Sequence, residues 1–504
     1  MNKKSFLSAI LLAVAGEMFA GGILTNTNQS IYFLRNPARD GAIGIDGIYS
    51  NPAGVAFLNN GFHFSFNWQS AWQTRTIDST NPVFALGAQN GGATTKTFKG
   101  EATAPVVPSI HAAYNKDRWS FQFGFAVTGG GGKCEFSDGL GSFEGAVGTI
   151  GTQLASAASQ LQAAGISVPS VTGYDADSYM QGRQYYFGFT LGAAYKVTDN
   201  LSVYGGLRVL YGTASYKAKI DNIKVVSGTS TYTLPGYMEA VSGGVTQTLE
   251  AVVGRYMAAG LSYEQAMQMP AVQQLVATGQ SLSTQAEQLA PYYNGVNLQS
   301  DQTGLGLAPI LGVDYKVGKF NLAAKYEFRT HMSMKNKSTV KEAMAIEAVN
   351  QFQDGTKIRE DSPALLTFGA QYSPVENVRI NAGYHHFYDR QSVKYGNKQQ
   401  LLKSGTNEYL GGIEWDPIEK LTVSGGFQIT KYGNTDAYMS DMSCVVDSWS
   451  FGLGAKYQVS EKVAVQAAYF QTNYQHYKTA MVSGVMDDFT RTNKVVGVGV
   501  DLTF

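Results

Sequence analysis

Apolar and polar residues alternate along several stretches of the chain, each eight to ten residues long. The clearest stretches are 62–69, 320–329, 421–430 and 496–504. Successive side chains of a β-strand point to opposite faces, so each stretch would place its apolar residues on one side. Strands of soluble sandwiches usually span about 5–6 residues, whereas a strand that crosses a membrane needs about 9–11. The pattern therefore predicts transmembrane strands, with apolar residues toward lipid and small or polar residues toward a lumen.

A short polar turn follows an aromatic residue at six places in the chain. The aromatic residues are Tyr114, Tyr195, Tyr315, Tyr372, Trp415 and Tyr457. Each closes the outward-facing set of its strand, at the level where an amphipathic ring favours the membrane interface. Six such residues in register predict an aromatic girdle at one end of a β-barrel.

Longer connections are expected between these hairpins. We place them at 79–103, 129–181, 221–298, 338–358, 395–405, 432–445 and 478–490. Short turns that alternate with long loops are typical of the periplasmic and extracellular ends of a bacterial barrel. The predicted fold class is therefore all-β: a transmembrane antiparallel β-barrel over 61–504, with about fourteen strands and both termini on the periplasmic side.

Two of the long loops carry helical patterns, at 146–164 and 246–290. In the second loop, apolar residues recur every three or four positions, which places them on one face of a helix. These residues are Leu249, Val252, Val253, Tyr256 and Met257. The pattern favours a packed cap over the barrel rim. The alternative is an apolar groove that first binds a hydrophobic ligand.

The first twenty residues have the order of a secretory signal peptide. Lys3 and Lys4 precede an apolar run at 6–15, and small residues follow it. The run is too short for a membrane-spanning helix, which needs about 20 apolar residues. We predict that 1–20 is removed on export. Cys134 and Cys444 would then meet an oxidising compartment, where they either form a disulfide or remain as distant thiols.

Charge and histidine content argue against several other functions. Lys+Arg and Asp+Glu both number 38, so no basic excess suggests a nucleic-acid partner. Among the histidines only His385 and His386 are adjacent, and consecutive strand residues face opposite sides. The glycine runs lack the context of a phosphate-binding loop. We predict no catalytic residue, no metal site, no cofactor and no enzymatic activity.

Residues 21–60 do not have the pattern of a barrel strand. They contain two Asn-Pro-Ala turns, at 36–38 and 51–53, and several glycines; proline restricts the residue before it and favours a turn. The segment is compact and lightly charged, which predicts a plug inside the barrel or at its periplasmic mouth.

Gly41-Ala42, followed by Asp46 and then Asn51-Pro52-Ala53, resembles the N-terminal hatch of the long-chain fatty-acid transporter family (FadL/TodX type). The resemblance covers about forty residues, and the long connections at 129–181 and 221–298 depart from it. It implies that the hatch gates the barrel. The residues assigned to gating are Asp46, Asn51, Pro52, Ala53 and Gly54. The alternative for 51–53 is a turn that only ends the hatch.

The same resemblance implies passive uptake of a long-chain fatty acid or another hydrophobic compound. Extracellular loops would collect the ligand, and it would leave sideways through a gap at an inward kink of the third strand. That strand is expected at 119–128, followed by Gly129, Gly130, Gly131 and Gly132. Glycine allows a strand to bend or to break its ladder. The alternative is that these glycines begin a flexible loop.

A general diffusion porin, or a structural barrel with adhesive loops, is the alternative function. Several charged residues expected in the lumen would suit a wet pore or a charge network in a plugged barrel. They are Arg208, Lys325, Glu327, Arg329, Arg379 and Asp389. The expected partners are a hydrophobic ligand, outer-membrane lipid and lipopolysaccharide, and the barrel-assembly machinery through Phe504. We expect a monomer in the outer membrane of a Gram-negative bacterium.

Overall fold

The computed structural model describes residues 25–339, 351–443 and 445–504. The predicted signal peptide and Cys444 lie outside these described residues. Whether the two cysteines form a disulfide or remain distant thiols is therefore untested. Cys134, the cysteine that the structure describes, is buried in a strand and not in a loop as expected.

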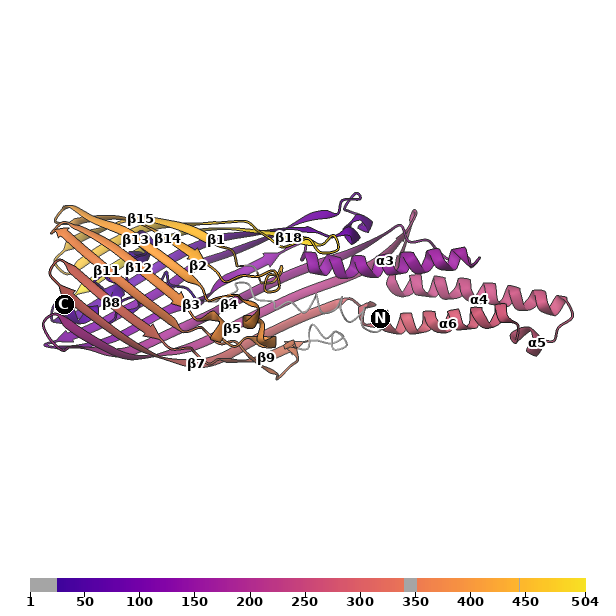
Figure 1. Cartoon of the computed structure of the whole chain (residues 1–504), viewed down its shortest axis with the longest axis horizontal. Coiled ribbons are helices and arrows are strands. Elements are labelled where there is room, and N and C mark those ends of the chain that lie inside the picture. Colours follow the sequence, from indigo (N-terminus) through magenta and orange to yellow (C-terminus); the bar gives the residue numbers. More distant parts are fainter. Residues whose placement is uncertain (1–24, 340–350, 444) are drawn as a thin grey trace.

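The described chain forms a closed antiparallel β-barrel of fourteen long strands (Figure 1), which confirms the predicted fold class and strand number. The long strands are β1 (Gly61–Thr80), β2 (Thr95–Lys116), β3 (Trp119–Phe136), β4 (Gly173–Lys196), β5 (Leu201–Ser227), β7 (Val296–Val317), β8 (Phe320–Glu327), β11 (Leu365–Val375), β12 (Val378–Phe387), β13 (Asn407–Ile418), β14 (Leu421–Lys431), β15 (Ser448–Ser460), β16 (Val463–Tyr474) and β18 (Met486–Thr503). The barrel closes where β1 pairs with β18, from His63 opposite Thr503 to Thr80 opposite Met486. Four short strands extend the sheet: β6 (Ser230–Thr233), β9 (Ser333–Thr339), β10 (Lys357–Arg359) and β17 (Tyr477–Lys478).

The six short turns lie where the sequence predicted them. They join β2 to β3, β4 to β5, β7 to β8, β11 to β12, β13 to β14 and β15 to β16. The C-terminus lies at the same end of the barrel (Figure 1), where the backbone N–H of Phe62 donates to the carbonyl of Phe504 at 3.0 Å. The long loops consequently gather at the opposite end.

An apolar belt surrounds the barrel next to these turns. The predicted aromatic residues point outward and are half-buried or exposed, as expected for an interfacial girdle. Their rings contact aromatic neighbours on adjacent strands: Trp119 and Tyr195 have centroids 4.7 Å apart, and Phe320 and Tyr372 have centroids 4.6 Å apart. In β1 the predicted inward set of His63, Ser65, Asn67 and Gln69 is buried.

Several strands continue beyond the belt, and the predicted loops at 79–103, 129–181 and 478–490 are therefore too long. β7 shows the reason. Its outward residues are apolar from Leu305 to Tyr315, but polar from Asn297 to Thr303. The outer face changes from lipid-exposed to water-exposed while the ladder continues, so the sequence loses its membrane pattern before the strand ends.

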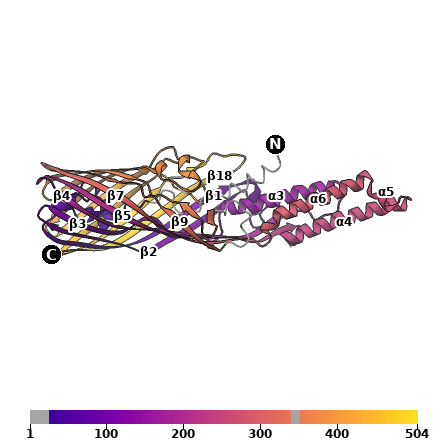
Figure 2. The ribbon, with the colours of Figure 1, turned by 90° about the horizontal axis from the view of Figure 1, so that it is seen from below.

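The helices of the described chain are α2 (Ile31–Arg35), α3 (Gly141–Ala163), α4 (Leu234–Ala258), α5 (Tyr263–Met267) and α6 (Pro270–Leu289), with 3-10 turns η1 (Ile45–Ile48), η2 (Gly54–Phe57), η3 (Pro82–Leu86), η4 (Ala290–Tyr292), η7 (Asp389–Gln391) and η8 (Tyr395–Leu401). Of these, α3 to α6 extend from the long-loop end of the barrel (Figures 1 and 2). No helix in the described part of the chain is long and apolar enough to cross a membrane.

Both predicted helical loops are present. The first, α3, packs on the strand extensions at the rim through Phe143, Val147 and Leu154, whereas the second does so only in part. The first half of α4 packs on the strand extensions through residues such as Tyr237 and Val241, whereas α4 and α6 then project outward as a hairpin (Figure 2). Near its tip, Val253 is buried against Ala266 and Val272, while Met257 is exposed. The predicted apolar face therefore stabilises the hairpin itself.

The change of the outer face along β7 predicts a position-dependent cost for a charged substitution. Leu311 lies in the apolar belt and is 54% exposed. Leu311→Arg should lower the free energy of unfolding by about 2–4 kcal/mol, because an arginine would face the hydrocarbon region. Urea titration in lipid vesicles measures the change. Gln299→Arg, on the same face of the same strand, is the control and should change it by less than about 1 kcal/mol. Equal costs at both sites would contradict the assigned belt.

Candidate functional site

Residues 25–60, which we call the N-terminal segment, lie against the inward-facing side chains of the barrel. Ser30 caps α2, accepting a hydrogen bond from the backbone N–H of Phe33. All five residues of α2 are buried, and Ile31, Phe33 and Leu34 pack against apolar side chains of β13, β16 and β18. The segment makes further apolar contacts with the wall, where Val55 packs near Ala113 and Ala56 packs near Ile310. Its other contacts with the wall are polar.

Glu414 of β13 is the centre of a buried ion-pair cluster. It lies 2.9 Å from Arg35, 3.3 Å from Arg39 and 3.4 Å from Arg379. Arg39 also pairs with Asp46 at 2.8 Å. Burial alone would lower the pKa of Arg39, but the carboxylates of Asp46 and Glu414 raise it above its usual range. The N-terminal segment therefore remains positively charged where it meets the wall.

Tyr49 forms a second contact between the segment and the wall. The cations of Arg208 and Lys325 lie 4.9 and 4.8 Å from its ring centroid, a cation–π arrangement. Lys325 also donates to the Tyr49 carbonyl at 2.6 Å, and Arg208 pairs with Glu327. Burial raises the pKa of the Tyr49 hydroxyl, so this group stays neutral.

His385 of β12 links the same segment to the barrel. One ring nitrogen lies 2.9 Å from Asp40 of the segment, and the other lies 2.7 Å from Glu408 of β13. All three side chains are nearly inaccessible to solvent. Each ring nitrogen of His385 faces one carboxylate. A protonated imidazole would therefore donate a charge-assisted hydrogen bond to each of the two carboxylates.

The structure brings four of the five predicted gating residues to one place on the wall. Asn51 donates to Asp314 of β7 at 2.5 Å and to the Ala42 carbonyl at 3.2 Å, and its side-chain oxygen accepts from the Gly54 N–H at 3.1 Å. The carbonyls of Pro52 and Ala53 accept hydrogen bonds, both at 2.7 Å, from Gln122 and Ser202 respectively.

Gly54 has no room for a side chain, and Asp46 lies elsewhere in the segment. A Cβ at Gly54 would lie 2.4 Å from the Asn51 amide nitrogen. Asp46 pairs with Arg39 and not with the Asn51 group. The Asn-Pro-Ala turn at 51–53 thus fixes the later part of the N-terminal segment to the wall. Asp46 stabilises the interior of the segment.

The barrel wall is interrupted between β2 and β3. The ladder pairs Ile110 with Phe125 and then resumes only at Thr103 opposite Lys133. On β3 the consecutive residues 126–129 are all buried, whereas on β2 Val106 is 59% exposed. This stretch of β3 therefore lies inward of its neighbour.

The four predicted wall-kink glycines lie in this interruption, inside β3 and not at the start of a loop. Gly130 and Gly132 have φ of 89° and 81°, a region that favours glycine. The β3–β4 register shifts on both sides of Gly130, with Gly129 opposite Tyr186 and Gly132 opposite Gln184. Glycines at these positions let the strand bend while β4 continues.

The beginning of the N-terminal segment occupies the inner side of this interruption. The Asn26 N–H donates to the Thr128 carbonyl at 2.9 Å, and its side chain donates to Gly130 at 2.7 Å. Gln29 donates to Val127 at 3.0 Å. Ser109 of β2 donates to the Gln29 carbonyl at 2.5 Å. Residues 25–29 thus bond backbone carbonyls of β3 where its ladder with β2 is interrupted, and a β2 side chain bonds the segment in turn.

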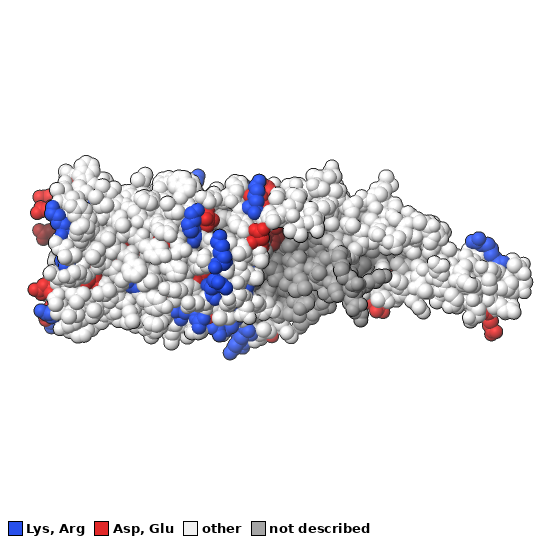
Figure 3. Space-filling model, in the orientation of Figure 1, with Lys and Arg blue, Asp and Glu red and all other residues white. Residues whose placement is uncertain are grey.

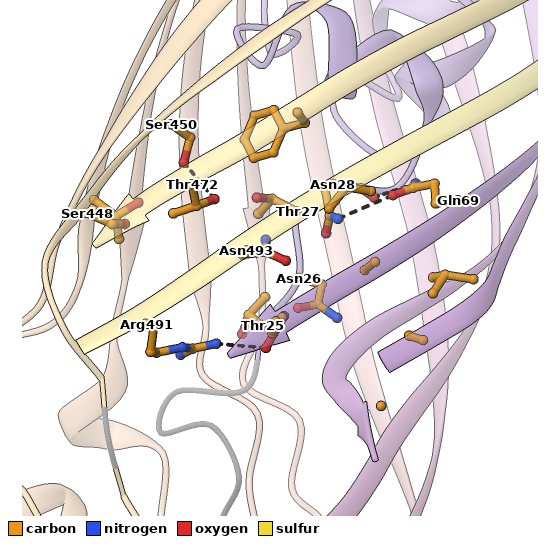
Figure 4. A pocket seen from close by; sticks show the side chains of 18 of the residues that line it. Thr25, Asn26, Thr27, Asn28, Gln69, Ser448, Ser450, Thr472, Arg491 and Asn493 are labelled. Carbon is orange, nitrogen blue, oxygen red and sulfur yellow. Dashed lines mark hydrogen bonds between the residues drawn. The ribbon is translucent and has the colours of Figure 1, made fainter. Parts of the chain in front are cut away.

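A cavity of about 190 Å³ lies beside this region. It is lined by 25–28, by β2 and β3 residues of the interruption, and by inward residues of β13 to β18. Most labelled side chains in Figure 4 are polar, among them Gln69, Ser450, Thr472 and Asn493. Phe33, Val107, Val127 and Phe470 add apolar surface. The cavity is therefore amphipathic.

Two of the charges expected in the lumen lie elsewhere. Arg329 is partly exposed on the outer wall and donates to the Gln391 carbonyl. Asp389 is buried in the turn η7, where it accepts from the Thr406 N–H at 2.7 Å. β8 ends at Glu327, so strand alternation no longer sets the direction of Arg329.

Sequence reasoning missed Arg35, Arg39, Asp40 and Glu414. These residues carry a signal in hindsight: two arginines four positions apart lie in an otherwise lightly charged segment, and Glu414 has the inward parity of its strand. The arginines and Glu414 lie far apart in the chain, so the sequence alone does not show that they pair.

Two solved structures share this architecture over nearly their whole length. One is a Pseudomonas aeruginosa FadL homologue, with 13% identity and a TM-score of 0.58, covering 96% of this chain and 100% of that one. The other is the P. putida toluene transporter TodX, with 12% identity and a TM-score of 0.53, covering 92% and 94%. The fold is that of FadL and TodX. No protein-family model and no curated protein sequence matches the chain.

The bonds of Asn51 make the N-terminal segment sensitive to a single substitution. Asn51→Ala removes one of the two side-chain donors to the buried Asp314, the other being Asn321, and should destabilise the segment by about 1–3 kcal/mol. Hydrogen exchange of the amides in 42–56 should accelerate, while exchange in β11 to β16 stays unchanged. Asn60→Ala, at an exposed position of the same segment, is the matched control. Unchanged exchange in Asn51→Ala would contradict the anchoring role.

Proposed function

We propose that the chain is a passive transporter of hydrophobic compounds across the outer membrane of a Gram-negative bacterium. The observation that carries this proposal is the interruption between β2 and β3, which the N-terminal segment fills from inside. A ligand in the adjoining cavity would be separated from the membrane by residues 25–29 alone. Displacement of these residues would open a lateral route.

The proposed route begins at the extracellular loops and ends in the membrane. The ligand passes from the loops to the cavity, the beginning of the N-terminal segment moves, and the ligand leaves between β2 and β3. An apolar chain gains about 0.8 kcal/mol per buried CH₂ when it reaches lipid, so exit toward the bilayer needs no energy source. The Asn51–Gly54 turn stays in place as an anchor, and the glycines of β3 keep the gap open.

The amphipathic cavity supports a long-chain fatty acid in preference to a pure hydrocarbon. Its polar lining would hydrogen-bond a carboxylate, while Phe33, Val107 and Phe470 would contact the alkyl chain. A diffusion porin is the weaker proposal, because residues 25–54 occupy the lumen and are held to the wall by ion pairs and hydrogen bonds.

A reversible cross-link tests the lateral route. Thr25 and Gly129 form an isolated antiparallel bridge, and antiparallel partners have Cα atoms about 4.5–5.5 Å apart, within disulfide range. In a chain with both native cysteines changed to serine, Thr25→Cys with Gly129→Cys should form a disulfide. Cells lacking their own transporter should lose uptake of labelled oleate when this disulfide forms and regain it on reduction.

The single Thr25→Cys variant controls for the substitution and should transport in both redox states. Uptake that continues at the normal rate through the oxidised double variant would contradict exit between β2 and β3. Passage of labelled sugar instead of oleate, in any variant, would support the porin alternative.

A further inference from the structure

The outer wall of the barrel carries a groove at the edge of the apolar belt, between β8 and the turns η7 and η8. The groove has a volume of about 580 Å³. Its lining includes Tyr326, Phe328, Arg329, His331 and Arg390. Phe328, which directly follows β8, is 40% exposed. The groove therefore has an aromatic side toward the hydrocarbon region and a cationic side toward the extracellular surface.

The cations of this groove lie close together with little negative charge between them. Guanidinium nitrogens of Arg329 and Arg359 lie 3.2 and 3.0 Å from the two ring nitrogens of His331. The one carboxylate beside them is the buried Asp361, 2.7 Å from Arg359 and 3.8 Å from Arg329. Arg390 is exposed and has no ion pair with any described residue. The positive charge thus exceeds the negative charge at the mouth of the groove.

Further cations extend this excess along β9 and β10. Lys335, Lys337 and Lys357 are exposed and likewise form no ion pair within the described chain. Figure 3 shows Lys and Arg side chains gathered in a band across this face of the barrel. Several exposed lysines on other strand extensions have carboxylate partners. The pairs are Lys99–Glu101, Lys133–Glu135, Lys219–Asp221 and Lys431–Asp447.

We propose that the groove binds a phosphate group of lipopolysaccharide in the outer leaflet. Arginine presents a planar set of donors that matches a phosphate. Arg329 and Arg390 line the groove, and Arg359 adds positive charge next to His331 of the lining. The acyl chains of the same lipid would lie along Tyr326 and Phe328. The negative charge of the bound phosphate group would offset the mutual repulsion of the cations. The proposal depends on the membrane placement of the barrel and not on the compound it transports.

Native mass spectrometry of the full chain in detergent tests the site by counting bound lipid A. Lipid A with both phosphates should bind, and lipid A without phosphates should bind at least tenfold more weakly. Arg329→Gln with Arg390→Gln should weaken binding about 25-fold, since each surface arginine contributes about fivefold toward an anionic headgroup. Lys133→Gln with Lys219→Gln removes two cations from paired positions on other strands and should leave binding unchanged.

Arg390→Gln alone breaks no ion pair within the described chain and keeps the test valid if the double variant does not fold. It should weaken binding about fivefold. Equal binding of phosphorylated and dephosphorylated lipid A would overturn the proposal, as would an unchanged affinity in Arg390→Gln. Complete displacement of lipid A by millimolar inorganic phosphate would also overturn it, because the groove would then bind a free ion and not a lipid.

Discussion

Charge buried in the barrel lumen is the constraint on which the rest of the structure depends. Strand alternation that turns apolar residues toward lipid turns Glu414, Glu327 and Asp314 inward. A buried carboxylate is costly unless it is paired and hydrogen-bonded. The N-terminal segment supplies the partners, with Arg35 and Arg39 for Glu414 and Asn51 for Asp314. The barrel and the segment are therefore electrostatically complementary, and the lumen is filled rather than open.

The segment is held unevenly, and this unevenness suits a gate. Between 35 and 51 its contacts with the wall include ion pairs, cation–π contacts, buried charged hydrogen bonds and apolar packing, whereas residues 25–29 are held by neutral hydrogen bonds to β3 and β2. Breaking a buried ion pair costs about 3–5 kcal/mol, while a neutral hydrogen bond contributes about 0.5–1.5 kcal/mol. The weakly held end lies at the gap in the wall, so a passage can open there without extraction of the whole segment.

The sequence predicts the periodic parts of this molecule well and the contacts between distant parts poorly. Alternation identified the belt strands and the aromatic girdle because lipid imposes one polarity on every outward position. The same criterion predicted β1, β2, β3 and β18 to be shorter than they are. Their outer faces meet water beyond the belt, although the hydrogen-bond ladder continues. The turn at 51–53 could be predicted from its proline and from its resemblance to the hatch of a known family. The pairing of Arg35 with Glu414 could not, because nothing local links residues almost four hundred positions apart.

The central claim is that the barrel carries hydrophobic molecules through a plugged lumen and is not a water-filled pore. The most direct test is the ratio of labelled oleate uptake to labelled sugar uptake in cells that express this chain and lack their own transporter. The account predicts that expression raises oleate uptake and leaves sugar uptake at the background level. Increased sugar uptake without increased oleate uptake would contradict it, and would mean that the N-terminal segment leaves a continuous aqueous path.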